Sequence, residues 1–314
     1  MKFLFISFCL FIIGAITNPL VAKTLNGFDL SRTTVPATQI LSGGPPKDGI
    51  PALLKPRFIS GSEDAHLKPN DKVLGLSIDG ISKAYPLKIL NWHEIVNDQI
   101  NNQGIVISYC PLCGSGMAFL ATLGEQNLTF GVSGLLYNSD VLMYDHQTDS
   151  LWSQIRGQAV SGPMAGEKLK QYPLLLTRWQ QWQKTHPDTL VLSENTGFRR
   201  NYDQDPYAGY SQSPKLYFPV ANRAPGSYSP KQLVLGLKGQ SGQIVFPLSE
   251  LRKHDQESFT YLFEGSTYRV HWDKQNDSAW ITDNNNNQQP ATLLYWFAWY
   301  AFYPDTAIFT AKGK

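Results

Sequence analysis

Three segments of this 314-residue sequence occur twice in the same order, and this self-similarity restricts the possible folds more than any other feature. The matching pairs are 73–87 with 234–248, 144–152 with 272–280, and 179–189 with 296–306. Internal similarity of this kind indicates that one structural unit occurs more than once. We therefore predict two degenerate copies of one unit, the first at 70–195 and the second at 231–314.

The two predicted copies differ mainly in one region. The early copy is longer between Leu90 and Tyr144, and the added stretch contains Trp92-His93-Glu94 and Cys110-Pro-Leu-Cys113-Gly114. Residues that both copies share are best explained as scaffold, so the added stretch is the better place to look for chemistry. The other ranges are an N-terminal extension at 23–69 and a connection at 196–230 that is rich in Tyr, Pro, Gly and Ser.

The local patterns predict mostly short strands. Lys72 to Ile78 and Lys83 to Leu87 are expected to form a hairpin around Asp79-Gly80, which is a strong turn signal. Further strands are expected at 104–109, 117–122, 141–145 and 151–155, and short helices at 87–98 and 172–186. We therefore expect an α+β fold of mainly antiparallel β-strands with short helices, and not a parallel α/β fold.

Residues 1–22 have the pattern of a secretory signal peptide. Lys2 precedes an apolar stretch from Phe3 to Ile16, and Leu20-Val21-Ala22 is a plausible cleavage site. We therefore expect an exported protein, periplasmic or extracellular, with no stable transmembrane segment after cleavage. A retained membrane anchor is the alternative interpretation.

The charge pattern limits the classes of partner. The formal net charge is +2, charged residues make up only 17% of the chain, and the basic residues form no cluster. Such a near-neutral pattern argues against binding to nucleic acid. We expect the partner to be a small molecule or another exported protein.

The strongest local signal is Cys110-Pro-Leu-Cys113-Gly114, which lies between two predicted strands. Two cysteines at this spacing serve thiol–disulfide exchange or metal binding, and in an oxidising compartment they also form structural disulfides. The motif resembles the metal-binding turn of rubredoxins and zinc ribbons. A redox pair usually begins a helix, whereas Gly114 and Gly116 are poor helix formers, and this difference favours a metal site.

A metal site here needs ligands other than cysteine, because the chain has no second cysteine pair. His93 is the first candidate, His146 is the second, and Asp145 or Asp140 is the third. Glu94 is a candidate for orienting His93 and for proton transfer. Two thiolates and one imidazole suit zinc, copper or iron, and the sequence does not choose among these transition metals.

Two alternatives stay open. As a thiol–disulfide oxidoreductase, the protein would use Cys110 as the attacking thiol and Cys113 as the resolving thiol. As a non-enzymatic binding module, it would offer an aromatic groove, and the two cysteines would form a structural disulfide. The catalytic candidates, if the protein is an enzyme, are therefore Cys110, Cys113 and Glu94.

The segment from Asp145 to Trp152 carries carboxylates that suggest calcium binding or acid–base chemistry. It recurs around Asp273 without a neighbouring cysteine pair, which favours a turn in which Asp and Ser side chains bond the backbone. The segment also resembles the Asp-rich hairpins of quinoprotein propeller blades, but two copies are too few for a propeller.

Several separate motifs together resemble one bacterial and archaeal family, the domain of unknown function 3179. They are Ala84 to Leu87, Trp92 to Asp98, Tyr109 to Gly114, Gly131 to Asp140, Leu151 to Gln154 and His186 to Thr189, and the resemblance spans roughly 50–310. It implies an exported protein and supplies no catalytic residues. The cysteine motif of the family falls on Cys110 and Cys113, and its His-Glu pair falls on His93 and Glu94.

Overall fold

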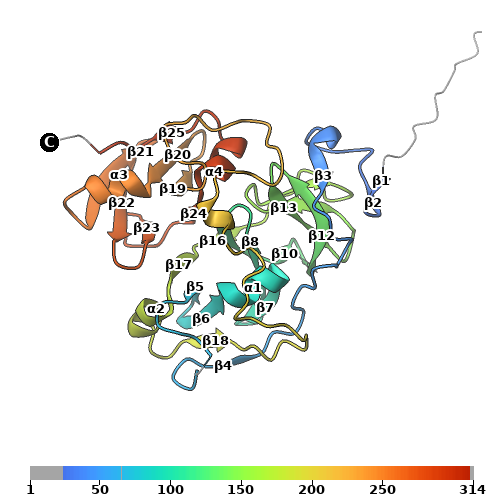
Figure 1. Cartoon of the computed structure of the whole chain (residues 1–314), viewed down its shortest axis with the longest axis horizontal. Helices are drawn as coiled ribbons and strands as arrows, with labels where there is room; N and C mark the ends of the chain where they lie inside the picture. The colour runs from blue at the N-terminus through green and yellow to red at the C-terminus, as the bar shows by residue number, and fades with distance from the viewer. Residues whose placement is uncertain (1–23, 65, 312–314) are drawn as a thin grey trace, which may run out of the picture.

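The computed structural model describes residues 24–64 and 66–311. The expected signal peptide at 1–22 lies outside the described residues. The described part is mostly β, with 41% strand and 11% helix, and its five larger sheets are arranged as a five-blade β-propeller (Figure 1). Within this part, no helix combines the length and the apolar character needed to cross a membrane.

Each blade is a sheet of three to five strands. The first blade holds β3 (Ile40–Ser42), β12 (Phe130–Tyr137), β13 (Asp140–Asp145), β14 (Leu151–Ser153) and β15 (Gln158–Ser161). The second holds β7 (Ile95–Ile100), β8 (Gln103–Cys110), β9 (Ser115–Leu120) and β16 (Gln171–Tyr172). The third holds β4 (Phe58–Ser60), β5 (Lys72–Ile78), β6 (Ile81–Pro86), β17 (Leu175–Arg178) and β18 (Leu190–Leu192).

The C-terminal part of the chain forms the other two blades. One holds β19 (Leu233–Lys238), β20 (Gln243–Pro247), β24 (Thr292–Tyr295) and β25 (Ala307–Ile308), and the other holds β21 (Ser258–Phe263), β22 (Ser266–Asp273) and β23 (Ser278–Thr282). Two small hairpins complete the strands: β1 (Thr24–Leu25) with β2 (Phe28–Asp29), and β10 (Thr122–Leu123) with β11 (Gln126–Asn127).

The expected α+β fold with two degenerate copies is wrong. The first expected copy, 70–195, supplies strands to three blades, and the second, 231–314, supplies two. Two of the three matching pairs, 73–87 with 234–248 and 179–189 with 296–306, reflect packing that two of the blades share. The third pair, 144–152 with 272–280, forms similar hairpin turns in two other blades. A Cβ atom on Gly75 would lie 2.2 Å from the ring of Trp182, and one on Gly236 would lie 2.2 Å from the ring of Trp299. Both positions require glycine because a tryptophan occupies that space.

The short helices follow strands and lie at one end of the blades. They are α1 (Leu87–His93), α2 (Trp179–Thr185), α3 (Leu248–Lys253) and α4 (Trp296–Phe302). The hairpin predicted around Asp79-Gly80 is confirmed by the pairing of β5 with β6. The helix predicted at 87–98 is too long, since Glu94 adopts a φ of +56° and β7 begins at Ile95. The helix predicted at 172–186 begins only at Trp179, because Gln171–Tyr172 and Leu175–Arg178 pair as the strands β16 and β17.

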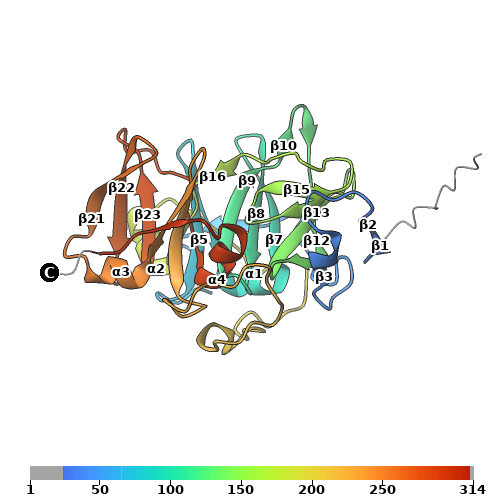
Figure 2. The same ribbon diagram turned by 90° about the horizontal axis from the view of Figure 1, so that it is seen from above.

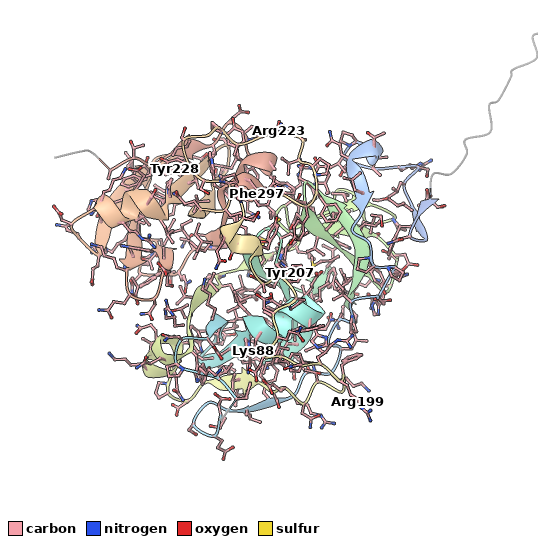
Figure 3. All side chains as sticks on the ribbon, in the orientation of Figure 1. Lys88, Arg199, Tyr207, Arg223, Tyr228 and Phe297 are labelled. Atoms are coloured by element: carbon pink, nitrogen blue, oxygen red, sulfur yellow. The ribbon has the colours of Figure 1, made fainter. Side chains whose placement is uncertain are left out.

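A long connection, residues 193–232, crosses the end of the propeller where α1, α3 and α4 lie (Figure 2). The connection contains one short 3-10 helix, η2 (Tyr210–Gln212). Another 3-10 helix, η1 (Ala37–Gln39), precedes β3 near the start of the described chain. The buried Lys231 Nζ fixes the connection, because it donates hydrogen bonds of 2.7 Å to the carbonyl oxygens of Tyr210, Ser213 and Lys215. Figure 3 shows Tyr207 of this connection near the middle of that face.

Candidate metal centre

The cysteine motif forms a tight turn between two paired strands, as the sequence predicts. Cys110 ends β8 and pairs with Ser115, which begins β9. Gly114 has a φ of +61°, and a Cβ atom there would lie 2.9 Å from the ring of Tyr295. Glycine is therefore needed at this position both for the left-handed backbone and for packing. The backbone N–H of Tyr295 donates a 2.9 Å hydrogen bond to the carbonyl of Cys113, which fixes the turn against β24 of a C-terminal blade.

A second hairpin, from the first blade, brings a carboxyl group to the same place. Asn138 and Ser139 connect β12 to β13 with φ values of +55° and +64°, as in a two-residue hairpin turn with left-handed central residues. The side-chain amide of Asn138 donates to the carbonyl of Ala301, and the hydroxyl of Ser139 donates to the carbonyl of Phe218. These bonds hold the turn in place, so Asp140 begins β13 beside the cysteines.

Cys110, Cys113 and Asp140 form one buried group. One ligand atom from each, the two Sγ atoms and a carboxylate oxygen, all lie within 4.8 Å of one another. The exposed fractions are 2% for Cys110 and 0% for both Cys113 and Asp140. Both cysteines are free thiols in this structure, and their Sγ atoms lie 3.8 Å and 3.4 Å from the carbonyl oxygen of Ser139.

The two oxygens of Asp140 have different surroundings. Oδ2 accepts a 3.0 Å hydrogen bond from the backbone N–H of Ile155. Oδ1 is buried and has no well-formed hydrogen bond from a described residue, although the backbone N–H of Val141 and the thiol of Cys113 lie close enough to lower the pKa of the carboxyl group. A buried polar atom without a partner is costly and points to a missing ligand or to strain.

Burial controls the protonation of this group. It raises the pKa of Asp140 to about 8, and the nearby carboxylate of Glu94 adds to this effect. Burial, followed by the adjacent sulfur of Cys110, raises the pKa of Cys113 well above its usual value. Both effects arise because a negative charge here has little solvent, and no cationic side chain in the described part of the chain forms an ion pair with it. A bound metal cation would supply that stabilisation.

A buried amide connects the two hairpins that form the group. Gln154 Oε1 accepts a 2.6 Å hydrogen bond from the hydroxyl of Ser115, and its Nε2 donates to the hydroxyl of Ser108 at 3.2 Å. Gln154 lies on the first blade and both serines lie on the second. Gln154 ends one of the motifs that carry the family resemblance, Leu151 to Gln154, but its residue type and position alone predict no role at the cysteines.

His93, the first candidate ligand from the sequence, lies outside the group of thiols. Its Nδ1 is 2.7 Å from the carbonyl oxygen of Pro51, and its Nε2 is 2.8 Å from the hydroxyl of Tyr202. Burial lowers the pKa of this imidazole. Both ring nitrogens are therefore used to hold α1 against neighbouring segments, as in a structural histidine.

The other two proposed ligands also lie elsewhere. His146 is exposed and stacks on Tyr144 with ring centroids 5.0 Å apart. Asp145 accepts hydrogen bonds from the backbone N–H of Thr148 at 2.7 Å, from its hydroxyl, and from Nε1 of Trp152 at 2.8 Å. Asp145 thus stabilises its hairpin, which agrees with the interpretation of this segment as a turn whose side chains bond the backbone.

Asp140 is only the third candidate ligand from sequence, although the turn residues Asn138-Ser139 directly precede it. The expected strands do not include β12, because all eight of its residues are buried and show no alternation of polar and apolar side chains. Once β12 is known, Asn138-Ser139 becomes a hairpin turn, and Asp140 falls at the start of the returning strand.

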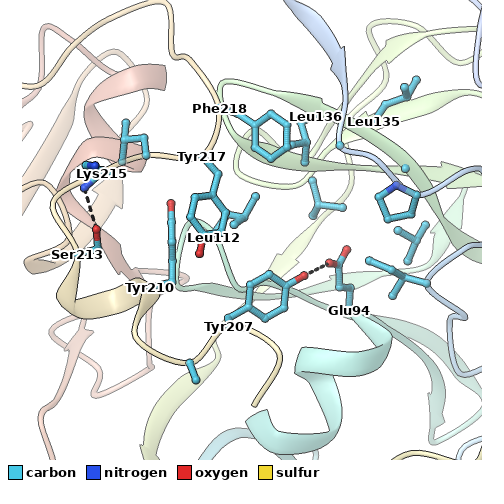
Figure 4. A pocket seen from close by; sticks show the side chains of 18 of the residues that line it. Glu94, Leu112, Leu135, Leu136, Tyr207, Tyr210, Ser213, Lys215, Tyr217 and Phe218 are labelled. Carbon is cyan, nitrogen blue, oxygen red and sulfur yellow. Dashed lines mark hydrogen bonds between the residues drawn. The ribbon is translucent and has the colours of Figure 1, made fainter. Parts of the chain in front are cut away.

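A cavity of about 830 Å³ adjoins the cysteine turn (Figure 4). Leu112 of the turn and Val141, next to Asp140, both contribute to its wall. Glu94, a catalytic candidate from the sequence, lines the same cavity, and its Oε1 accepts a 3.3 Å hydrogen bond from the hydroxyl of Tyr207. Glu94 does not orient His93, because the two ring nitrogens of His93 bond Pro51 and Tyr202 while the carboxylate of Glu94 bonds Tyr207.

The comparisons with known proteins give a family and no activity. No curated protein and no solved structure matches the chain. The family model described as protein of unknown function (DUF3179) matches residues 47–294, which is most of the chain and includes both hairpins of the candidate metal centre. The chain therefore belongs to the DUF3179 family of proteins of unknown function.

Proposed function

We propose that this protein binds one transition-metal ion through Cys110, Cys113 and Asp140. The observation that carries the proposal is the convergence of two thiols and one carboxyl oxygen, all within 4.8 Å of one another, in a buried site. The three residues come from two different blades, so their proximity is a property of the fold and not of one local turn.

The donor set favours zinc among the transition metals. Two thiolates and one carboxylate oxygen are common zinc ligands, and three protein ligands leave a fourth position for water or a small molecule. The carbonyl of Ser139 is a neutral oxygen beside both sulfurs. Binding would release protons from the thiols and the carboxyl group, and the cation would balance the resulting charges. Copper remains the second metal to test, since thiolates also bind Cu(I).

The burial of the sulfurs argues against thiol–disulfide exchange with a protein partner. Exchange requires an accessible thiolate. Cys113 is fully buried, burial raises the pKa of its thiol, and the motif forms a turn between strands rather than the start of a helix. We include export in the proposal on the basis of the sequence of residues 1–22, so the metal would be held outside the cytoplasm.

The test is a metal titration of the full chain. Protein purified from its own compartment is analysed for metal and for free thiols, stripped with a chelator under reducing conditions, and titrated with Co²⁺. Thiolate-to-cobalt charge-transfer absorption should rise to a single equivalent and disappear when zinc is added. Cys113→Ser and Asp140→Asn should each weaken binding by more than about tenfold, a loss seen even for residues that merely support a metal ligand.

Two histidine variants serve as controls. His146→Ala changes an exposed residue and should leave the titration unchanged. His93→Gln tests the ligand set that the sequence alone favours, and it should also leave sulfur coordination intact. The proposal is overturned if the protein takes up no metal, if uptake needs His93 and not Asp140, or if the thiols are isolated as a disulfide that exchanges reversibly.

A further inference from the structure

The cavity beside the cysteine turn has a mostly apolar wall and one buried acid. Val132, Leu135 and Leu136 of β12 form one side, and Tyr217 and Phe218 of the long connection face them (Figure 4). Its volume of about 830 Å³ lies within the usual range of cavities that bind small molecules, which are mainly apolar with a few polar groups.

Glu94 is the buried acid. Its exposed fraction is 6%, and its backbone has a φ of +56°, which is strained for a residue with a long side chain. Among the described residues, the carboxylate of Glu94 accepts a single hydrogen bond, from the hydroxyl of Tyr207 at 3.3 Å. No described lysine, arginine or histidine forms an ion pair with it. Burial accordingly raises the pKa of Glu94 to about 7.

The remaining polar groups of the cavity do not compensate this carboxylate. Lys215 is exposed, and Figure 4 shows it on the opposite side of the cavity from Glu94. The hydroxyl of Tyr210 is buried and makes no hydrogen bond to a described residue, so it is a second polar atom without a partner. Tyr207 and Tyr217 add aromatic rings to the wall, and such rings attract cations through their faces. The ring of Tyr210 already carries a cation, because Nζ of Lys231 lies 3.3 Å from its centroid.

We propose that this cavity binds a small molecule with an apolar body and one ammonium group, and that the carboxylate of Glu94 pairs with the ammonium. The apolar wall would hold the body of the ligand, the ring of Tyr207 would lie beside its charged end, and the hydroxyl of Tyr210 is available as an additional acceptor. An anionic ligand is disfavoured, since it would have to approach an uncompensated buried carboxylate.

This inference does not depend on the proposed metal. None of the three proposed metal ligands lines the cavity, and every residue used in the argument belongs to the cavity itself. The two proposals can therefore fail separately. If both hold, the ligand lies next to the metal centre, because Leu112 and Val141 are adjacent in sequence to Cys113 and Asp140.

The test uses three probes that share one apolar body: phenylbutylammonium, phenylbutanol and phenylbutanoate. Binding to the full chain is measured by calorimetry and by ligand-detected saturation-transfer NMR, both with and without chelator. The ammonium should bind most tightly and the carboxylate most weakly. Glu94→Gln, which keeps the size of the side chain, should weaken ammonium binding by about tenfold or more and leave the alcohol almost unaffected.

Two further variants keep the test decisive. Glu250→Gln changes a glutamate of equal exposure, 6%, that pairs with Lys253 outside the cavity, and it should not alter binding. Leu216→Trp fills the cavity from the connection and should weaken all three probes together, which provides a test even if Glu94→Gln does not fold. The inference is overturned if no probe binds, if the alcohol or the carboxylate binds best, or if Glu94→Gln leaves the preference unchanged.

Discussion

Asp140 and Asp145 are the two ends of the same strand, β13, and both have an exposed fraction of 0%. Asp145 accepts hydrogen bonds from a backbone amide, a threonine hydroxyl and a tryptophan ring. Asp140 accepts one well-formed bond, from the N–H of Ile155, and its second oxygen has no such partner among the described residues. The N–H of Val141 and the thiol of Cys113 lie close enough to lower the pKa of the carboxyl group. The two carboxyl groups are equally buried but have different surroundings. Hydrogen-bond donors surround the carboxylate of Asp145, whereas the two thiols of Cys110 and Cys113 lie beside that of Asp140.

This contrast distinguishes Asp145, whose role is structural, from Asp140, which is a candidate metal ligand. A carboxylate that is fully hydrogen-bonded within the protein has no remaining capacity for a ligand. One that is left incomplete in the interior lowers stability and persists only where something else compensates for it. Glu94 is a carboxylate of this incomplete kind, since in the described part of the chain it accepts a hydrogen bond from Tyr207 alone.

The largest expected effect is on folding. Asp145→Ala would leave the amide of Thr148 and the indole of Trp152 without their acceptor, and should lower the free energy of unfolding by about 4 kcal/mol. Asp140→Ala removes one such bond and should cost about 2 kcal/mol. Urea denaturation of the chelated protein measures both. Equal losses for the two variants would show that the contrast between the two carboxylates does not exist.

The next effect is a pH dependence that Glu94 should impose on stability. Its pKa in the folded protein is about 7, against an ordinary value of 4.5, so the folded state holds a proton that the unfolded state loses. The contribution of Glu94 to stability should therefore fall as the pH rises from about 4.5 to about 7, by about 3 kcal/mol, and then level off. Glu94→Gln should remove this contribution and leave the fall that the raised pKa of Asp140 causes. Thermal unfolding of both proteins across that pH range measures the difference.

Glu250 provides the opposite sign as a control. A hydrogen bond from Lys253 lowers the pKa of Glu250, so its contribution to stability is present above the ordinary glutamate pKa and disappears as the pH falls. Glu250→Gln should therefore lose stability at neutral pH, where Glu94→Gln gains it. A gain in both variants would contradict the account of the buried Glu94 carboxylate.

A somewhat smaller effect is the stabilisation by zinc, which should depend on Asp140 at one end of β13 and not on Asp145 at the other. Zinc at a hundredfold excess over its dissociation constant should stabilise the wild-type protein by about 2.7 kcal/mol. Asp145→Asn should retain this stabilisation in spite of its lower baseline, and Asp140→Asn should lose most of it. Thermal unfolding with and without zinc measures the difference, and the same zinc response in both variants would count against Asp140 as a ligand.

The smallest effect is expected at His146. This residue is exposed and stacks on Tyr144, so His146→Ala should change stability by less than about 0.5 kcal/mol and leave metal uptake unaltered. A clear loss of metal in this variant would mean that the hairpin end of β13 takes part in the site after all.

Local features of this protein could be predicted from sequence, whereas the number of blades could not. Asp79-Gly80 identifies a hairpin because the turn residues are local, and Cys110 to Gly114 identifies a turn for the same reason. The strand β12 gives no alternation, since both of its faces are buried. The sequence repeats mark the glycine–tryptophan packing of two blades and an aspartate-stabilised hairpin turn in two others, while the second blade carries no repeat. The repeated pairs therefore suggested two copies and not five blades.

The candidate site shows the same division. The pair Cys110 and Cys113 could be found from its spacing, but the third member depends on which hairpin the propeller brings beside it. His93 is close in sequence to the cysteine strands, and sequence proximity favoured it. The fold instead uses both of its ring nitrogens for Pro51 and Tyr202 and places Asp140, from another blade, at the thiols.

X-ray absorption spectroscopy of the zinc-loaded full chain tests the metal centre most directly. Two sulfur neighbours at about 2.3 Å and oxygen neighbours at about 2.0 Å are predicted, without the multiple scattering that an imidazole ring produces. In Asp140→Asn, the two sulfur neighbours should remain and the oxygen shell should change. A shell without sulfur, or one with histidine scattering that disappears in His93→Gln, would contradict the proposed centre.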